Sequence, residues 1–126
     1  MRALIVDDSR AMRAIIAKIL RELGAEVVEA GNGREGLERL ASIPAVDVAL
    51  VDWNMPVMDG LAFVRELRAR REYDRMQILM VTTESDAQHV SSALDAGANE
   101  YVMKPFDRTA LLSKLEAVGL GAAAAG

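Results

Sequence analysis

Polar side chains follow four short apolar runs of this sequence, each at the point where the run ends. The clearest case is Asp52, because five of the six residues at 46–51 are apolar. Such a run is typical of a strand buried on both faces of a parallel sheet. Ligands of open α/β sheets bind where the strands end, so a carboxylate there is expected to be functional. The polar residues at the four ends are Asp7, Asp8, Asp52, Thr82, Thr83 and Lys104.

This combination of side chains contains the parts of a phosphoryl-transfer site. Three carboxylates brought together raise each other's pKa, so positive charge is needed to offset their repulsion. Mg²⁺ suits such a site, because its ligands are carboxylate oxygens, waters and phosphate oxygens. Lys104 supplies a second positive charge. A carboxylate nucleophile, a metal ion, an ammonium group and a hydroxyl group together can transfer a phosphoryl group and stabilise its charge.

The apolar runs alternate with amphipathic segments, which predicts βαβ units and a parallel sheet with helices on both faces. Five strands suit the flavodoxin-like α/β fold, with strand order 2-1-3-4-5 and right-handed crossovers. In that order strands 1, 3, 4 and 5 are neighbours, so the polar residues at their ends are expected to meet at one edge of the sheet. The predicted strands are residues 3–6, 26–30, 46–51, 77–81 and 100–103.

Helix signals separate the predicted strands. An apolar face of six residues predicts the first helix, and Gly24 ends it as a C-cap. Asn32, Asp59 and Asp107 mark the starts of the second, third and fifth helices. Residues 85–88 form a capping box before the fourth helix. The first apolar face holds Met12, Ile15, Ile16, Ile19, Leu20 and Leu23, and the fourth helix is expected to bury Val90, Ala93 and Leu94.

Size and composition indicate one soluble domain. The chain has 126 residues, enough for a sizeable core, and its net charge of −4 argues against a general nucleic-acid surface. It has no cysteine, which excludes disulfides and thiolate chemistry, and no apolar stretch near the roughly 20 residues of a membrane span. We expect a cytoplasmic protein that binds neither nucleic acid nor membrane, with a domain at 1–118 and a low-complexity tail at 119–126.

In their order and spacing, these residues resemble the receiver domain of two-component signalling, and most closely the single-domain chemotaxis regulators of the CheY type. The resemblance covers residues 2 to about 118. Each motif alone is weak, but all of them together at these spacings are specific. The motifs are Asp7-Asp8, Asp52-Trp53-Asn54-Met55-Pro56, Met58-Asp59-Gly60, Thr82-Thr83-Glu84, Ala96-Gly97-Ala98, Tyr101 and Lys104-Pro105-Phe106.

The resemblance implies a role for each residue around the acceptor. Asp52 would accept a phosphoryl group from a phosphohistidine of a sensor histidine kinase. One Mg²⁺ per domain would be bound by the side chains of Asp8 and Asp52 and by the backbone carbonyl of Asn54. Asp7 would act mainly through a metal-bound water. Lys104 would pair with Asp52 and then with the phosphoryl oxygens, and its bond to the following proline would be cis.

The resemblance also implies how the phosphoryl group would be sensed and lost. Thr82 would hydrogen-bond a phosphoryl oxygen, and Tyr101 would turn inward as an aromatic switch. Asn54 and Glu84 would flank the phosphoryl group and tune its hydrolysis, a pairing that resembles regulators with rapid dephosphorylation. Thr83 stands where the wider family has a small alanine, and it is expected to narrow access to the group.

The implied output is contact with another protein through the face formed by helix 4, strand 5 and helix 5. A flagellar motor switch component is the expected target, and a phosphatase is a further expected partner. The protein would be a monomeric switch whose only catalysis is its own phosphorylation and dephosphorylation. The candidate contacts on this face are Ala87, Val90, Tyr101 and Lys114.

Other functions stay open at this point. A phosphorelay shuttle, or a receiver module of a longer regulator, would carry the same residues. An aspartyl-phosphate phosphatase usually has Asp-x-Asp, but Asn54 stands at the second position here and cannot act as a general acid. A flavin-binding module needs a phosphate loop rich in Ser, Thr and Gly, whereas Asp7-Asp8-Ser9 would repel a phosphate unless a metal intervened.

Some remaining residues are expected to be ordinary surface. His89, the only histidine, is predicted to be solvated, and Trp53 is expected to be a partly exposed reporter near the site. A group of arginines is predicted to form a solvated helix end, where the helix dipole favours positive charge. These arginines are Arg65, Arg68, Arg70 and Arg71.

Overall fold

The computed structural model of the chain describes residues 1–83 and 88–120. Within these residues five strands alternate with five α-helices, and a short 3-10 helix precedes the fourth strand, which confirms the predicted alternation. The elements are β1 (Arg2–Val6), α1 (Arg10–Glu22), β2 (Glu26–Ala30), α2 (Gly33–Ser42), β3 (Val48–Asp52), α3 (Gly60–Arg68), η1 (Arg71–Tyr73), β4 (Gln77–Thr82), α4 (Val90–Ala96), β5 (Glu100–Met103) and α5 (Arg108–Ala117).

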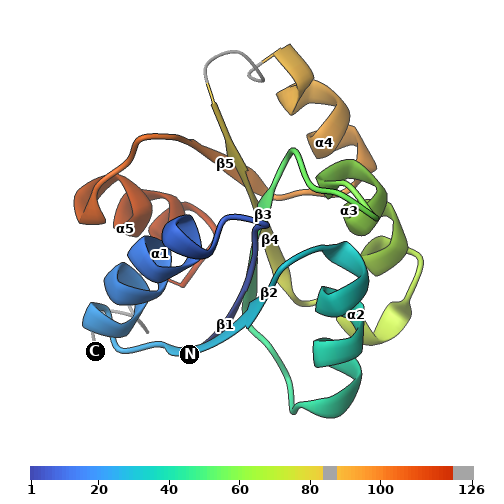
Figure 1. Cartoon of the computed structure of the whole chain (residues 1–126), viewed down its shortest axis with the longest axis horizontal. Helices are drawn as coiled ribbons and strands as arrows, with labels where there is room; N and C mark the ends of the chain where they lie inside the picture. The colour runs from blue at the N-terminus through green and yellow to red at the C-terminus, as the bar shows by residue number, and fades with distance from the viewer. Residues whose placement is uncertain (84–87, 121–126) are drawn as a thin grey trace.

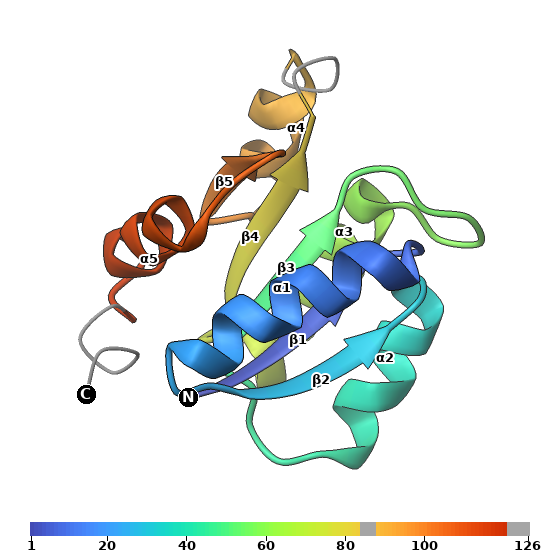
Figure 2. The same cartoon turned by 60° about the vertical axis from the view of Figure 1, so that its left-hand side comes forward.

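The strands form one parallel sheet in the predicted order β2-β1-β3-β4-β5. Helices α1 and α5 cover one face, and α2, α3 and α4 cover the other (Figure 1). The strands all run in the same direction, so their arrowheads lie toward one edge (Figure 2). In this register Val51 of β3 lies between Val6 of β1 and Met80 of β4. The residues that follow these strands are therefore brought to one edge of the sheet.

Polar side chains begin four of the helices. Ser9, Asn32, Asp59 and Asp107 each precede a helix. Each side chain accepts a hydrogen bond of 2.8–3.2 Å from the backbone N–H three residues later, as helix N-caps do. The predicted starts of α2, α3 and α5 are thus confirmed. The predicted capping box at 85–88 lies mostly outside the described residues.

The core has two parts, one between the sheet and helices α1 and α5, the other between the sheet and helices α2, α3 and α4. The predicted apolar faces are wrong in part. In α1, Ile16 and Leu20 are buried, but Ile15 is 53% exposed. In α4, Ala93 is buried, but Leu94 is 41% exposed. A helix buries only the width of its apolar stripe that contacts the sheet, and residue spacing alone does not give that width.

The prediction of a solvated arginine cluster is wrong for Arg68. Its guanidinium group donates hydrogen bonds of 2.8 Å to the carbonyl oxygens of Tyr73 and Met76, which precede β4. It also donates to the carbonyl oxygen of Gly97 at 2.9 Å and to Oδ1 of Asn99 at 2.8 Å, both before β5. Gly97 has φ +119, and a Cβ there would lie 2.5 Å from Cγ of Arg68. Arg68 therefore joins α3 to the starts of two strands.

The ends of several elements refine the predicted boundaries. Strand β3 begins at Val48, and Asp47 just before it accepts the backbone N–H of Arg2 at 2.8 Å through its side chain. Gly24 follows α1 with φ +90, as its predicted role requires. Leu120 packs against the core under α1 and α5, and residues 121–126 of the predicted tail lie outside the described residues. None of the described helices has the length and apolar character to cross a membrane.

Candidate functional site

Three carboxylates meet at the C-terminal edge of the sheet, as the strand order predicts. Asp7 and Asp8 follow β1, and Asp52 is the last residue of β3. One carboxylate oxygen from each residue lies within 4.8 Å of the others. Asp7 is only 1% exposed, Asp52 is half-buried and Asp8 is exposed. The cluster is therefore buried on the Asp7 side and open to solvent on the Asp8 side.

Lys104 lies between two of these carboxylates. Its Nζ is 3.2 Å from Oδ2 of Asp7 and 3.2 Å from Oδ1 of Asp52. The backbone N–H of Lys104 donates to the carbonyl oxygen of Thr82 at 2.6 Å, which ties the lysine to the end of β4. The bond between Lys104 and Pro105 is cis, as the resemblance implies. Lys104 is thus positioned through its side chain by Asp7 and Asp52 and through its backbone by Thr82, at the ends of three different strands.

Lys104 alone does not keep the pKa of Asp52 at its ordinary value. Burial and the charge of Asp7 raise the pKa of Asp52 from its ordinary value of 3.8 to about 6, although Lys104 opposes this shift. Burial alone lowers the pKa of Lys104, but the charges of Asp52 and Asp7 outweigh burial and raise it. A further cation beside Asp52 would therefore relieve repulsion that Lys104 does not fully offset.

This balance predicts how the stability of the protein depends on pH. A carboxyl group whose pKa is raised by folding contributes stability below its unfolded pKa, and this contribution is lost as the pH rises through the folded pKa. Near pH 4 the carboxyl group of Asp52 is protonated in the folded parent, whose Asp52 has a pKa of about 6. Asp52→Asn, which carries no charge at any pH, is therefore expected to have the same free energy of unfolding as the parent at that pH. Above about pH 7 it is expected to exceed the parent by about 2 kcal/mol. Urea unfolding of both proteins in EDTA measures the difference, and a gap that does not change with pH would contradict the prediction.

The donor atoms of the cluster suit a hard divalent cation. Asp7, Asp8 and Asp52 offer oxygen atoms only, which is the ligand chemistry that Mg²⁺ prefers. Burial first, and then repulsion by Asp7, raise the pKa of Asp52, and a cation would favour its charged form. Asn54, the predicted backbone ligand, lies two residues after Asp52 in the loop between β3 and α3. The residues present therefore fit one Mg²⁺ at this edge of the sheet.

The two threonines predicted at the site lie at the end of β4. Thr82 is 1% exposed, and its Oγ1 has no hydrogen-bond partner among the residues that the structure describes. Thr83, the next residue, is half-buried. A buried hydroxyl without a partner is uncommon and unfavourable. Thr82 pairs in register with Met103, the neighbour of Lys104, so this hydroxyl belongs to the same edge of the sheet as the carboxylates.

Gly60 shapes the loop that carries the acceptor, a role that its place in the sequence motif does not reveal. A Cβ at this position would collide with the backbone oxygen of Asp52 and would lie 3.1 Å from Cα of Trp53. The backbone N–H of Gly60 donates to the carbonyl oxygen of Trp53 at 3.1 Å. A larger residue would push the start of α3 away from the end of β3. The sequence signal, Asp59 followed by Gly60, predicts a helix start but not this close approach.

The expectation that His89 is a solvated surface residue is wrong. The residue is half-buried, and its ring stacks on the indole of Trp53 with centroids 5.0 Å apart and planes inclined by 5°. Trp53 is itself half-buried and directly follows Asp52. The stack therefore joins the start of α4 to the loop after the acceptor. It also places the only tryptophan where a change at Asp52 can alter its fluorescence.

The predicted partner face is described only in part. Ala87 of this face lies outside the described residues, as does Glu84, which is predicted to tune dephosphorylation. Val90 is the first residue of α4 and is half-buried, as are Tyr101 on β5 and Lys114 on α5. Nζ of Lys114 lies 4.5 Å from the centroid of the Tyr101 ring, so these two predicted contacts touch each other.

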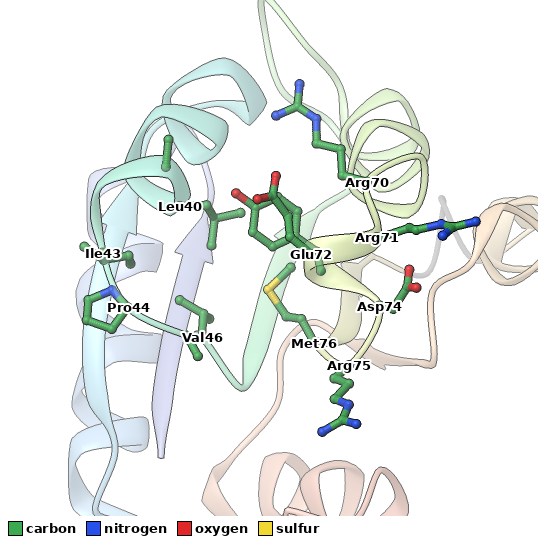
Figure 3. A pocket seen from close by; sticks show the side chains of 13 residues that line it. Leu40, Ile43, Pro44, Val46, Arg70, Arg71, Glu72, Asp74, Arg75 and Met76 are labelled. Carbon is green, nitrogen blue, oxygen red and sulfur yellow. The ribbon is translucent and has the colours of Figure 1, made fainter.

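A wide hollow lies at the opposite edge of the sheet. It has a volume of about 810 Å³ and is lined by the segments just before β3 and β4. Leu40, Val46 and Met76 face the hollow, whereas the guanidinium groups of Arg71 and Arg75 point away from it (Figure 3). Because the strands are parallel, their N-terminal ends lie at the edge away from the carboxylates. The hollow is therefore separate from the carboxylate site.

Comparisons with known proteins show the family of this chain. The response regulator receiver domain family matches residues 3–116. The chemotaxis protein CheY homolog of Campylobacter jejuni is 46% identical over 119 residues, which cover 94% of this chain and 92% of that protein. The solved structure of the chemotaxis response regulator CheY4 of Vibrio cholerae has a TM-score of 0.85 and 37% identity, and the match covers 93% of this chain and 97% of that one.

The same domain also occurs as part of a larger solved protein. A probable two-component system response regulator/GGDEF domain protein matches with a TM-score of 0.88 and 32% identity over 94% of this chain. The match covers 48% of that protein, so this chain spans about half its length. Sequence relatives and solved structures point to one family. The chain belongs to the response regulator receiver domain family, and its curated relatives include CheY chemotaxis proteins.

Proposed function

We propose that this protein is a phosphorylation switch whose acceptor is Asp52. The observation that carries the proposal is the placement of Asp52 at the open C-terminal edge of the sheet, within 4.8 Å of two other carboxylates and 3.2 Å from the ammonium group of Lys104. A nucleophile beside fixed positive charge is what phosphoryl transfer needs. Asp52 is also reachable by a donor, because Asp8 leaves one side of the cluster exposed.

In the proposed reaction, a carboxylate oxygen of Asp52 attacks the phosphorus of a phosphohistidine on a sensor histidine kinase. A P–O bond forms as the P–N bond breaks, and the imidazole leaves with the electron pair. The ammonium group of Lys104, already 3.2 Å from Oδ1 of Asp52, then pairs with the phosphoryl oxygens. Asp8, Asp52 and the backbone carbonyl of Asn54 would hold Mg²⁺, with Asp7 acting mainly through a metal-bound water, and the ion would supply positive charge that neutralises the transferring group.

The switch is proposed to reset itself by hydrolysis. Water attacks the phosphorus, the P–O bond to Asp52 breaks, and inorganic phosphate leaves. Asn54 follows the acceptor by two residues with an exposed side chain, a position from which it can orient the attacking water together with Glu84. Thr83 narrows the approach to the phosphoryl group. This catalysis acts on the protein's own acceptor, so it does not make the protein an enzyme for an external substrate.

The proposed output is contact with a partner through α4, β5 and α5. Thr82 has a buried hydroxyl that lacks an acceptor among the described residues, and a phosphoryl oxygen on Asp52 would supply one. Movement of Thr82 toward Asp52 makes room for Tyr101 to turn inward and changes this face. Because several relatives are named as chemotaxis proteins, we propose a component of the flagellar motor switch as the partner, with a phosphatase as a regulator.

A phosphorelay shuttle, or a receiver that serves a longer regulator, is the second candidate. The solved response regulator/GGDEF domain protein favours it, because a domain of the same fold makes up about half of that chain. Both candidates share phosphoryl acceptance on Asp52 and differ in what reads the phosphorylated state.

Beryllofluoride, which imitates a phosphoryl group on a carboxylate, tests the shared proposal. Adding it with Mg²⁺ is expected to change the fluorescence of Trp53, which directly follows Asp52 and stacks on His89. Leaving out Mg²⁺ is expected to remove the response, because the cation and Lys104 together offset the added negative charge. A parent protein that gives no response, or the same response in EDTA, would contradict phosphoryl acceptance at this site.

A further inference from the structure

The ring of Tyr101 is held between the core and a cation. On one side it packs against the core cluster under α2, α3 and α4. On the other side Nζ of Lys114, from α5, lies 4.5 Å from the ring centroid. A cation within about 6 Å of an aromatic face is attracted to it, and the attraction grows as both groups lose water. Both residues are half-buried, so this contact contributes to the position of the ring.

Glu100 holds Lys114 over the ring. Its Oε1 is 3.4 Å from Nζ of Lys114 and also accepts the backbone N–H of Tyr101 at 3.0 Å. The side chains of Lys114 and Glu100 are only 31% and 27% exposed. A free lysine side chain has many rotamers, so a carboxylate fixed by the backbone of Tyr101 itself reduces the entropy lost in forming the contact. We call Glu100, Tyr101 and Lys114 the Tyr101 clamp.

The ring of Tyr101 lies on the same side of the sheet as the buried hydroxyl of Thr82. Met80 pairs in register with Tyr101, and Thr82 pairs with Met103. Side chains alternate along a strand, so Met80 and Thr82 point to one face, and Tyr101 shares that face with Met80. The ring of Tyr101 and the hydroxyl of Thr82 are therefore diagonal neighbours on two adjacent strands. A change in the position of one side chain can alter the position of the other.

We propose that Lys114, held by Glu100, is a positioning residue that keeps Tyr101 in its resting place and so weakens the binding of a phosphoryl group at Asp52. The inference rests on the proposed function, because it concerns the regulation of the same acceptor. If Tyr101 leaves its place when Asp52 is occupied, the contact with Lys114 breaks. A contact made only in the resting state lowers the apparent affinity of any ligand that favours the other state.

Lys114→Met tests the clamp, because methionine keeps an unbranched apolar side chain and removes the cation. Its apparent affinity for beryllofluoride in Mg²⁺ is expected to rise about two- to fivefold, the range of a partly exposed cation–π contact. Lys114→Arg keeps the cation over the ring, so it is expected to bind with parent affinity. Glu100→Gln leaves an acceptor for the N–H of Tyr101 but breaks the ion pair, so it is expected to give an intermediate rise.

The sign of the effect separates the clamp from simple electrostatics. Removing a positive charge from a protein weakens its attraction for an anion, whereas the clamp predicts tighter binding. Lys18→Met is the matched control: Lys18 lies exposed on α1, so its loss is expected to leave the affinity unchanged or lower it. Equal tightening in the Lys18 and Lys114 variants would overturn the inference.

Fluorine NMR supplies a second readout, which compares the unliganded variants with the beryllofluoride complex of the parent. The chain has two tyrosines, so 3-fluorotyrosine labelling gives a signal from Tyr101 and a reference from Tyr73. Tyr73 is the last residue of η1 and lies at the other edge of the sheet. In unliganded Lys114→Met, the Tyr101 signal is expected to shift toward its position in the beryllofluoride complex. In Lys114→Arg it is expected to stay at the parent position.

The outcomes distinguish the inference from the function on which it rests. If the parent responds to beryllofluoride but Lys114→Met keeps both its affinity and its Tyr101 signal, the inference is overturned and the proposed function stands. If the parent does not respond at all, phosphoryl acceptance fails, and the inference that rests on it fails with it. Tighter binding in Lys114→Met, restored to the parent value in Lys114→Arg, supports the inference.

Discussion

Asp52→Asn is expected to abolish phosphoryl uptake from acetyl phosphate in the presence of Mg²⁺. The amide keeps the shape of the side chain, but it carries no oxygen nucleophile of comparable strength. Loss of a covalent nucleophile lowers rates by orders of magnitude, so we expect a decrease of at least about 100-fold. Intact-protein mass spectrometry in a time course measures the fraction that carries one phosphoryl group.

The structure offers a matched control for this loss. Asp59 lies in the same loop, and its carboxylate accepts the N–H of Ala62 at 2.8 Å to begin α3. Asn is also a good N-cap, so Asp59→Asn makes the same chemical change without touching the acceptor, and uptake is expected to stay at the parent rate. Unfolding does not explain the loss in Asp52→Asn, because that variant is expected to be the more stable protein at neutral pH.

A residual signal in Asp52→Asn would be informative about the neighbouring carboxylates. Asp7 is buried and is paired with Lys104 at 3.2 Å, whereas Asp8 is exposed. Asp8 is therefore the more accessible second acceptor. Uptake at the parent rate, with the phosphoryl group mapped to Asp8 by peptide analysis, would contradict the assignment of Asp52 as the acceptor.

The parts of this molecule that sequence predicts well are those with local signals. A few adjacent residues are enough to identify an apolar run at a strand, a polar cap before a helix or a glycine after one. From the strand order, the convergence of Asp7, Asp52 and Lys104 then follows, because parallel strands end at one edge. The distances of 3.2 Å from Lys104 to both carboxylates agree with that reasoning.

The parts that sequence does not predict are contacts between side chains on separate elements. His89 stacks on Trp53, and Arg68 bonds to segments before β4 and β5. Both types of residue are common on surfaces, so nothing in their neighbourhood distinguishes them. The same holds for Lys114, whose place over Tyr101 depends on how α5 packs beside β5. Such pairings depend on packing geometry, which residue periodicity does not specify.

Ile15 and Leu94 also show that residue periodicity does not determine which side chains are covered by neighbouring elements. Both have the spacing of core residues, yet they are 53% and 41% exposed. Helical periodicity identifies the side of a helix that is apolar, but neighbouring elements decide how much of that side is covered. Sequence patterns therefore place the core strands and the acceptor edge correctly and leave the outer limits of the helix faces undetermined.

Lys104→Met is expected to lower the free energy of unfolding by about 3 kcal/mol near pH 7.5 in EDTA. The change leaves Asp7, which is 1% exposed, and Asp52 without the cation that lies 3.2 Å from each of them. Removing one partner of a buried ion pair is costly because the remaining charge stays desolvated. At about pH 5 the loss is expected to shrink, since Asp52, with a pKa of about 6, is then largely protonated.

A double-mutant cycle with Asp52→Asn separates the two ion pairs of Lys104. In the Asp52→Asn background only the pair with Asp7 is left to lose, so Lys104→Met is expected to cost about 1 kcal/mol less than in the parent. Urea unfolding of the four proteins measures this coupling, and Lys18→Met, an exposed lysine on α1, controls for loss of one positive charge. An equal cost in both backgrounds would mean that Lys104 is held by Asp7 alone. Its ammonium group could then bind a phosphoryl group on Asp52 without first losing a stabilising contact with the carboxylate of Asp52.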